Sequence, residues 1–210
     1  MRASTLPEHT TESAMKAKPG GNTQPRSVAA QGWQDQAVQR RWGWVEPAVW
    51  TPRMLTALDR GVAGGKWFSL MDKVWRPANL RAAFARVAKN GGAAGVDHVS
   101  VAQFGAHRDA ELARLQQALQ DGSYQPQAIR RTYIDKPGSK EQRPLGIPTV
   151  RDRTVQGAVR QAIEPIFERD FAEHSYGFRP RRGAKDALRR VDALLKTGRG
   201  WVVDADLKRY

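Results

Sequence analysis

The spacing of apolar residues predicts a mainly helical chain that contains one β-hairpin. Over residues 76–92, apolar side chains recur at helical spacing and two glycines follow, which predicts an amphipathic helix with a defined end. Leucines at similar spacing predict a second helix that ends near Asp121. From Asp152 onward, apolar residues repeat every fourth position and predict a long helix, which Pro165 should kink or divide. A further amphipathic helix is predicted over residues 183–195.

Three stretches are predicted to be strands. Residues 128–134 alternate in polarity and are rich in β-branched and aromatic side chains, so we expect a strand there. Residues 135–144 contain Gly and Pro and predict a turn, and residues 145–148 predict the returning strand of a basic hairpin. The run 201–207 also alternates and predicts a strand with one buried face.

The first 90 residues divide into two regions of different composition. Residues 1–31 are rich in Ser, Thr, Gln, Gly and Pro, which predicts a disordered tail. Six of the seven tryptophans lie between residues 33 and 75, and we interpret them as packing residues of a helical N-terminal extension over residues 32–90. Because arginines such as Arg40 and Arg41 lie between them, stacking of these tryptophans on RNA bases stays open.

Charge points to a polyanionic partner. The 210 residues carry a net charge of +14, and residues 126–200 hold 17 Lys and Arg against 9 Asp and Glu. Such an excess favours nucleic acid, because cations that neutralise phosphates release condensed counterions; an anionic membrane surface is the weaker alternative. The sequence has no cysteine, no apolar run long enough to span a bilayer and no apolar leader, which predicts a cytoplasmic protein.

Three groups of residues could carry chemistry. Lys136, Lys140 and Arg143 surround the hairpin turn, where cations and backbone amides can close over phosphates. Six cations follow a turn onto the last predicted helix and can track a nucleic-acid backbone; they are Arg179, Arg181, Arg182, Lys185, Arg189 and Arg190. Asp204 and Asp206, two residues apart on the predicted strand, would point to one side and could hold Mg²⁺. The histidines lack metal-ligand spacing, and no phosphate-binding glycine loop or nucleophile elbow is present.

The order of three motifs resembles a known family. RPLGIPTVRDR (residues 143–153), SYGFRP (175–180) and DADLK (204–208) occur in the order and spacing of group II intron-encoded reverse transcriptases, the maturase-type enzymes. The resemblance covers roughly residues 40–210. It implies an α+β fold: the fingers over residues 91–199 and the beginning of the palm of a right-hand polymerase over residues 200–210.

The resemblance also implies roles for individual residues. Lys136 and Arg143 would bind the incoming triphosphate, and Asp206, with Asp204 as the weaker candidate, would bind Mg²⁺ at a two-metal site. Residues that would face the RNA template and DNA primer are Arg151, Arg153, Phe178, Arg179, Arg181, Arg182, Lys185, Arg189 and Arg190. The implied activity is RNA-directed DNA polymerase, combined with intron RNA binding in splicing and mobility.

The chain ends at Tyr210, within the first catalytic motif, and lacks the later Y-A-D-D strand of the family. Because one aspartate cannot assemble a two-metal centre, we interpret the chain as a truncated member and expect no nucleotide incorporation by these residues alone. Two alternatives stay open: a non-catalytic RNA-binding module that assists intron RNA folding, and a retron-type or diversity-generating reverse transcriptase.

Overall fold

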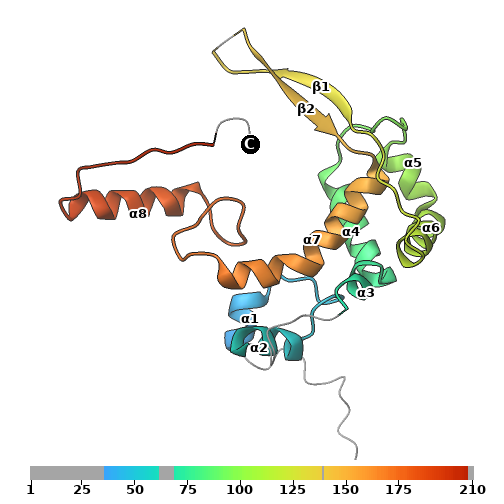
Figure 1. Ribbon diagram of the computed structural model, residues 1–210, viewed down its shortest axis with the longest axis horizontal. Coiled ribbons are helices and arrows are strands. Elements are labelled where there is room, and N and C mark those ends of the chain that lie inside the picture. The colour runs from blue at the N-terminus through green and yellow to red at the C-terminus, as the bar shows by residue number, and fades with distance from the viewer. Residues whose placement is uncertain (1–35, 62–68, 139, 208–210) are drawn as a thin grey trace, which may run out of the picture. The chain divides into compact units, whose positions relative to one another are not determined.

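The structure is a computed structural model that describes residues 36–61, 69–138 and 140–207. The predicted tail over residues 1–31, together with Trp33 and Trp67, lies outside the described residues. The described part contains helices and one two-stranded sheet (Figure 1). The helices are α1 (Gln36–Trp42), α2 (Pro52–Arg60), α3 (Met71–Val74), α4 (Pro77–Asn90), α5 (Val101–Ala106), α6 (Arg108–Gln120), α7 (Val150–Asp170) and α8 (Ala184–Lys196), and the strands are β1 (Arg130–Asp135) and β2 (Gln142–Ile147).

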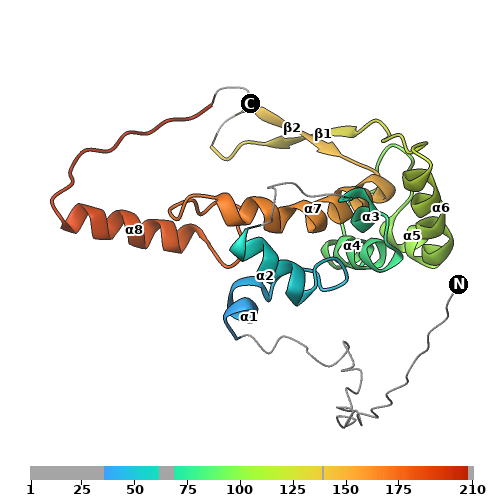
Figure 2. The same ribbon diagram turned by 60° about the horizontal axis from the view of Figure 1, so that its bottom comes forward.

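The core forms where α4 packs along α7, which lie side by side in Figures 1 and 2. Gly157 on α7 permits the close approach, because a Cβ atom there would lie 3.3 Å from the Cβ of Ala83 on α4. Asn79 is fully buried and its side-chain amide donates to the carbonyls of Lys73, Val74 and Ala158, at 2.9, 3.3 and 3.1 Å. These bonds join α3, α4 and α7 around one hydrophobic core.

Two tryptophans of the extension belong to this core. Trp42 and Trp50 are both 0% exposed. The indole of Trp42 donates to Asp59 at 2.9 Å, and that of Trp50 donates to the carbonyl of Gln161 at 3.1 Å. The packing interpretation is confirmed for these two residues. The extension and α7 therefore share one core. The predicted boundary between the extension and the fingers, at residue 90, stays a prediction.

The long helix α7 begins at a side-chain cap and runs through its proline. The Thr149 hydroxyl accepts a hydrogen bond from the amide of Asp152, which satisfies a free donor of the first turn. Pro165 is fully buried within α7, and the helix continues to Asp170. Pro165 therefore does not divide the helix, and the other expected effect, a kink, stays a prediction.

The last predicted strand is absent from the described residues. Residues 199–207 form no regular element, and Trp201 and Val203 are 98% and 92% exposed. Alternation alone does not make a strand, because the backbone groups need a neighbouring strand for their ladder. In the described part of the chain, only β1 and β2 pair. The prediction of a strand with one buried face over residues 201–207 was wrong.

None of the helices in the described ranges combines the length and the apolar character of a membrane span.

Candidate nucleic-acid interface

The hairpin register brings the two predicted triphosphate ligands to one face. The strands pair antiparallel with Ile134 opposite Arg143. Lys136 lies two residues beyond Ile134, and its amide donates to the carbonyl of Glu141 at 2.9 Å, which extends the ladder. Because side chains alternate between the faces of a sheet, Lys136 and Arg143 lie on the same face.

The Lys136 ammonium is paired but accessible. Its Nζ atom lies 2.5 Å from Oε2 of Glu141, and the two side chains are 38% and 72% exposed. Exposed ion pairs contribute little stability, typically about 0–1 kcal/mol, because water screens both charges. A phosphate group can therefore compete with Glu141 for Lys136 at small cost.

A buried carboxylate anchors the base of the hairpin. Asp152 is 2% exposed and accepts hydrogen bonds from the Tyr124 hydroxyl (2.6 Å), the Gln127 amide (3.1 Å) and the Thr149 hydroxyl (2.8 Å). Burial, followed by the hydrogen bond to Asp152, raises the pKa of Tyr124, so that its hydroxyl stays a donor. A two-stranded hairpin is marginal by itself. These bonds fix the segment that enters β1 to the first turn of α7.

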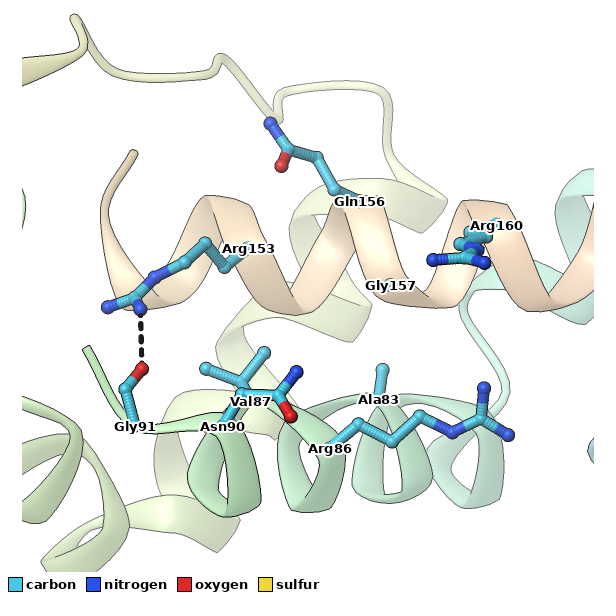
Figure 3. A pocket seen from close by; sticks show the side chains of 9 residues that line it. All are labelled: Ala83, Arg86, Val87, Asn90, Gly91, Arg153, Gln156, Gly157 and Arg160. Atoms are coloured by element: carbon cyan, nitrogen blue, oxygen red, sulfur yellow. Dashed lines mark hydrogen bonds between the residues drawn. The ribbon is translucent and has the colours of Figure 1, made fainter. Parts of the chain in front are cut away.

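Arg151 and Arg153, both predicted to face the RNA template and DNA primer, make contacts within the fold, and Arg153 binds backbone carbonyls. Arg153 donates to the carbonyl of Gly91 at 2.9 Å (Figure 3) and to the carbonyl of Ala93 at 3.0 Å. It thereby ties the end of α4 to α7. The Arg151 guanidinium lies over the Tyr124 ring, 5.2 Å from its centroid. Contact of either arginine with RNA stays a prediction.

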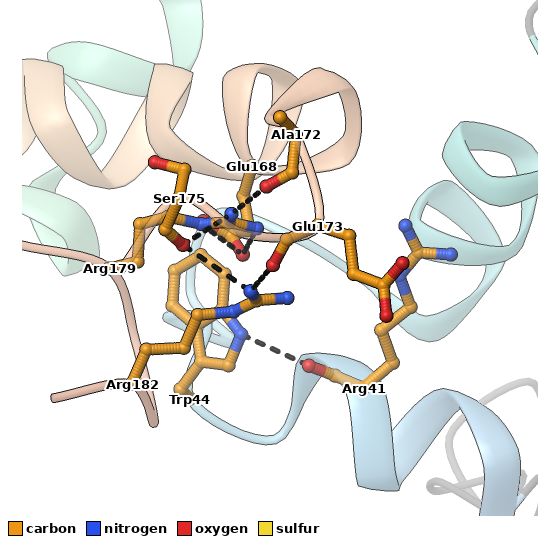
Figure 4. A network of polar contacts seen from close by, with 8 residues as sticks. All are labelled: Arg41, Trp44, Glu168, Ala172, Glu173, Ser175, Arg179 and Arg182. Carbon is orange, nitrogen blue, oxygen red and sulfur yellow. Dashed lines mark hydrogen bonds and ion pairs between the residues drawn. The ribbon is translucent and has the colours of Figure 1, made fainter. Parts of the chain in front are cut away.

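Arg179 is the buried anchor of the turn between α7 and α8. Its side chain is 6% exposed and donates five hydrogen bonds. Three go to the Glu168 carboxylate, and two go to the carbonyls of Ala172 (2.7 Å) and Ser175 (2.9 Å) (Figure 4). The guanidinium also lies 5.2 Å from the centroid of the Phe171 ring. We therefore assign Arg179 a structural role, because its donors are used within the fold; its contact with RNA stays a prediction.

The same turn presents Phe178 to solvent. Phe178 is 103% exposed and has a φ of 56°, in the left-handed region that non-glycine residues rarely adopt. An exposed aromatic ring can stack on an unpaired base; contact of Phe178 with the template stays a prediction.

The two arginines after the turn lie against the N-terminal extension and the end of α7. Arg181 Nη1 donates to the carbonyl of Arg40 in α1, and Arg182 Nη1 donates to the carbonyl of Glu173. The Arg182 guanidinium also lies 5.8 Å from the centroid of the Tyr176 ring. Each arginine uses one arm of its guanidinium in these carbonyl bonds, so other N–H groups stay available.

Helix α8 carries the remaining predicted cations. Lys185, Arg189 and Arg190 are exposed, and Arg189 pairs with Asp186 at 2.8 Å. The helix is amphipathic as predicted, yet none of its residues is buried. Its cations are accessible to a polyanion, and its apolar residues, such as Leu188 at 67% exposure, are also uncovered.

The two candidate metal ligands do not form a site within the described chain. Asp204 and Asp206 are exposed in the irregular segment after α8. In the described ranges, no group of three or more His, Cys, Asp or Glu side chains could hold a metal ion. These residues alone therefore do not fit a two-metal Mg²⁺ centre.

Two acidic residues that position the candidate site were not identified from the sequence. Asp152 organises the base of the hairpin, and Glu168 fixes Arg179. The first had a signal, since Thr149 followed three residues later by Asp152 is a capping pattern. The second had none, because Glu168 and Arg179 are eleven residues apart across a turn.

Comparison with known proteins identifies relatives for about half of the chain. No family model matches it. The chain is 46% identical to Protein YkfC of Escherichia coli over 120 residues, which are 55% of this chain and 31% of that protein. It is 43% identical over 100 residues to the group II intron-encoded protein LtrA of Lactococcus lactis, 48% of this chain and 16% of LtrA. It is also 31% identical over 98 residues to the putative COX1/OXI3 intron 1 protein of Saccharomyces cerevisiae, 47% of this chain and 12% of that protein.

The resemblance to group II intron-encoded proteins is thereby confirmed over about half of the chain. The matched region spans less than a third of the length of each of these relatives.

Proposed function

We propose that this chain, whose relatives over half its length are group II intron-encoded proteins, supplies the RNA-binding fingers of an intron reverse transcriptase. The observation that carries the proposal is the similarity to LtrA. The polymerase activity, the dNTP substrate and the Mg²⁺ requirement belong to the proposal, as does the fingers-and-palm fold. Intron RNA and a template–primer are the proposed partners.

The hairpin geometry supports the nucleotide-facing role of two residues. Lys136 and Arg143 share a face near the turn, and a triphosphate needs more than one cation because its charge is spread over several oxygens. In the proposed reaction, these two side chains bind and orient the triphosphate. Asp206 would contribute one Mg²⁺ ligand, in combination with carboxylates outside the described residues.

The test of the proposed function is binding of a labelled RNA-template, DNA-primer duplex, followed by fluorescence anisotropy. We expect binding by the wild-type chain, unchanged affinity for Asp206→Ala, and weaker affinity for Arg189→Gln combined with Arg190→Gln. An affinity that does not respond to loss of these arginines would contradict the proposal. The expectation that the 210 residues do not incorporate dNTPs stays a prediction, and robust primer extension in Mg²⁺ would refute it.

A second function is supported by the accessible cations. Lys185, Arg189 and Arg190 are exposed, whereas Asp204 and Asp206 form no metal site among the described residues. A non-catalytic module that binds intron RNA needs the exposed cations and does not need the aspartates. Rescue of intron splicing by an Asp206→Ala chain would favour this function, and loss of splicing with that variant would exclude it.

A further inference from the structure

A basic cavity lies between the N-terminal extension and the turn that follows α7. It has a volume of about 420 Å³. Its wall is formed by residues of α1 and the segment just after it, by the end of α7, and by the turn before α8. Arginines from all three parts line it: Arg40, Arg41, Arg169, Arg179, Arg181 and Arg182. Arg179, Arg181 and Arg182, which were predicted to contact RNA, therefore share the cavity with Arg40 and Arg41 of the extension, which were not in that predicted set.

Within the described part of the chain, three of these six arginines are paired with a carboxylate, and three are not. Two carboxylates line it, Glu168 and Glu173, and Glu168 is fully engaged by Arg179. Arg41 and Arg169 pair with Asp59 and Asp170 outside the lining, at 2.9 and 3.1 Å. Arg40, Arg181 and Arg182 thus share the cavity with the single carboxylate of Glu173. Like charges held together repel one another, and an anion bound among them removes this repulsion.

The guanidinium groups of Arg181 and Arg182 are held in place before any ligand arrives. Arg181 Nη1 donates to the Arg40 carbonyl, and Arg182 Nη1 donates to the Glu173 carbonyl. Figure 4 shows the second arm of the Arg182 guanidinium pointing away from the carbonyls that bind the first. A planar guanidinium with a free arm matches the geometry of two phosphate oxygens. Because these side chains are already ordered, binding costs less conformational entropy.

The form of the anion follows from what surrounds the cavity. Exposed Lys185, Arg189 and Arg190 continue along the chain from Arg182, and the net charge of the whole chain is +14. A polymer of phosphates can use the cavity and these cations together, whereas a free phosphate can use only the cavity. Trp44 and Phe171 also line the wall and offer aromatic surface to a sugar or base.

We propose that this cavity binds a backbone phosphate of RNA, and that α1 and the turn after α7 form one composite RNA site through it. This inference rests on the proposed RNA-binding function. It adds Arg40, a residue of the extension, to the side chains that bind RNA.

The test compares charge-matched variants of the full chain. The probe is a fluorescein-labelled RNA stem–loop, titrated by anisotropy over a range of salt concentrations. Arg40→Gln is the main variant, because Arg40 contributes only its backbone carbonyl to the bonds of the turn, and the variant should fold. Lys89→Gln on α4 is the control, since Lys89 is exposed and lies outside the cavity lining. Melting curves establish that both variants are folded.

We expect Arg40→Gln to weaken binding about tenfold and to reduce the slope of log K against log salt by about 0.7–0.9. Combining it with Arg182→Gln should weaken binding further. Lys89→Gln should leave both quantities close to wild type.

Each other outcome has a distinct meaning. Equal, small effects of Arg40→Gln and Lys89→Gln would overturn the composite site while the proposed function stands. Failure of the wild type to bind any RNA would instead refute the proposed function. Inorganic phosphate alone could raise the melting temperature of the wild type and not that of Arg40→Gln, while Arg40→Gln binds RNA as tightly as the wild type. That result would identify a free phosphate as the ligand and overturn the inference.

Discussion

Replacement of Arg179 distinguishes an internal anchor from a residue that binds RNA. Arg179 and Glu168 are 6% and 15% exposed at their side chains and lie 2.6 Å apart. Removing one partner of a buried pair typically costs about 3–5 kcal/mol, because the other charge is left unpaired. Since water still reaches part of Glu168, we expect Arg179→Ala to lower the unfolding free energy by about 3 kcal/mol.

Arg179→Lys provides the sharper comparison. Lysine keeps the positive charge but cannot reproduce the planar fork that binds the carboxylate and two carbonyls. The absence of two or so of these hydrogen bonds should cost about 2 kcal/mol. Binding of RNA through charge alone would survive this change. The anchor role therefore predicts that stability falls in Arg179→Lys even though its charge is retained.

The assay is urea denaturation followed by far-ultraviolet circular dichroism, with RNA affinity measured in parallel. A double variant, Arg179→Met with Glu168→Leu, serves as the control, because it leaves neither charge of this pair buried and unpaired. It should recover more than half of the unfolding free energy that Arg179→Ala loses. If Arg179→Ala instead changes stability by less than about 0.5 kcal/mol and abolishes RNA binding, the anchor role is wrong and the prediction from sequence is right.

Further predictions concern the hairpin base and the exposed ring. Gly95→Ala should destabilise the chain, since a Cβ atom there would lie 2.7 Å from the backbone nitrogen of Thr149; differential scanning fluorimetry should show a lower melting temperature. Asp152→Ala should cost about 1–3 kcal/mol in urea denaturation, because it leaves buried donors unpaired, and hydrogen exchange should rise in β1 and β2. Tyr124→Phe should be less stable than wild type at pH 7, with a difference that shrinks above about pH 10, because the raised pKa of Tyr124 means that only the unfolded state ionises there. Phe178→Gly should keep full stability, since the ring is exposed and glycine accepts the positive φ, yet it should bind RNA more weakly in the anisotropy assay.

The core helices were predictable where burial repeats locally. Leu80, Ala83 and Phe84 recur at helical spacing because one face of α4 meets α7, and all three are buried as that pattern implies. In α4 the local pattern and the tertiary packing agree. Turn residues and alternation located the hairpin, although its strands are mostly exposed. β1 lies close to the predicted strand 128–134, whereas β2 begins at Gln142, inside the predicted turn and three residues before the predicted returning strand 145–148.

Long-range packing decided what the sequence left open. Arg179 and Arg181 look alike in the sequence, yet only Arg179 meets a carboxylate brought close by the turn. The run 201–207 alternates as β1 does, but no neighbouring strand lies among the described residues to pair with it. Lys136 and Arg143 were assigned from the family resemblance, and the strand register added that they share a face.

The salt dependence of RNA binding tests the central claim most directly. The measurement is the affinity of the full chain for a group II intron RNA domain, with wild type compared with Arg189→Gln combined with Arg190→Gln. We predict a steep fall in wild-type affinity as salt rises, and a shallower slope in the variant, by about 0.7–0.9 for each phosphate that the variant no longer neutralises. Affinity that is insensitive to salt, or a slope that is unchanged in the variant, would contradict the proposal that these cations bind the RNA backbone.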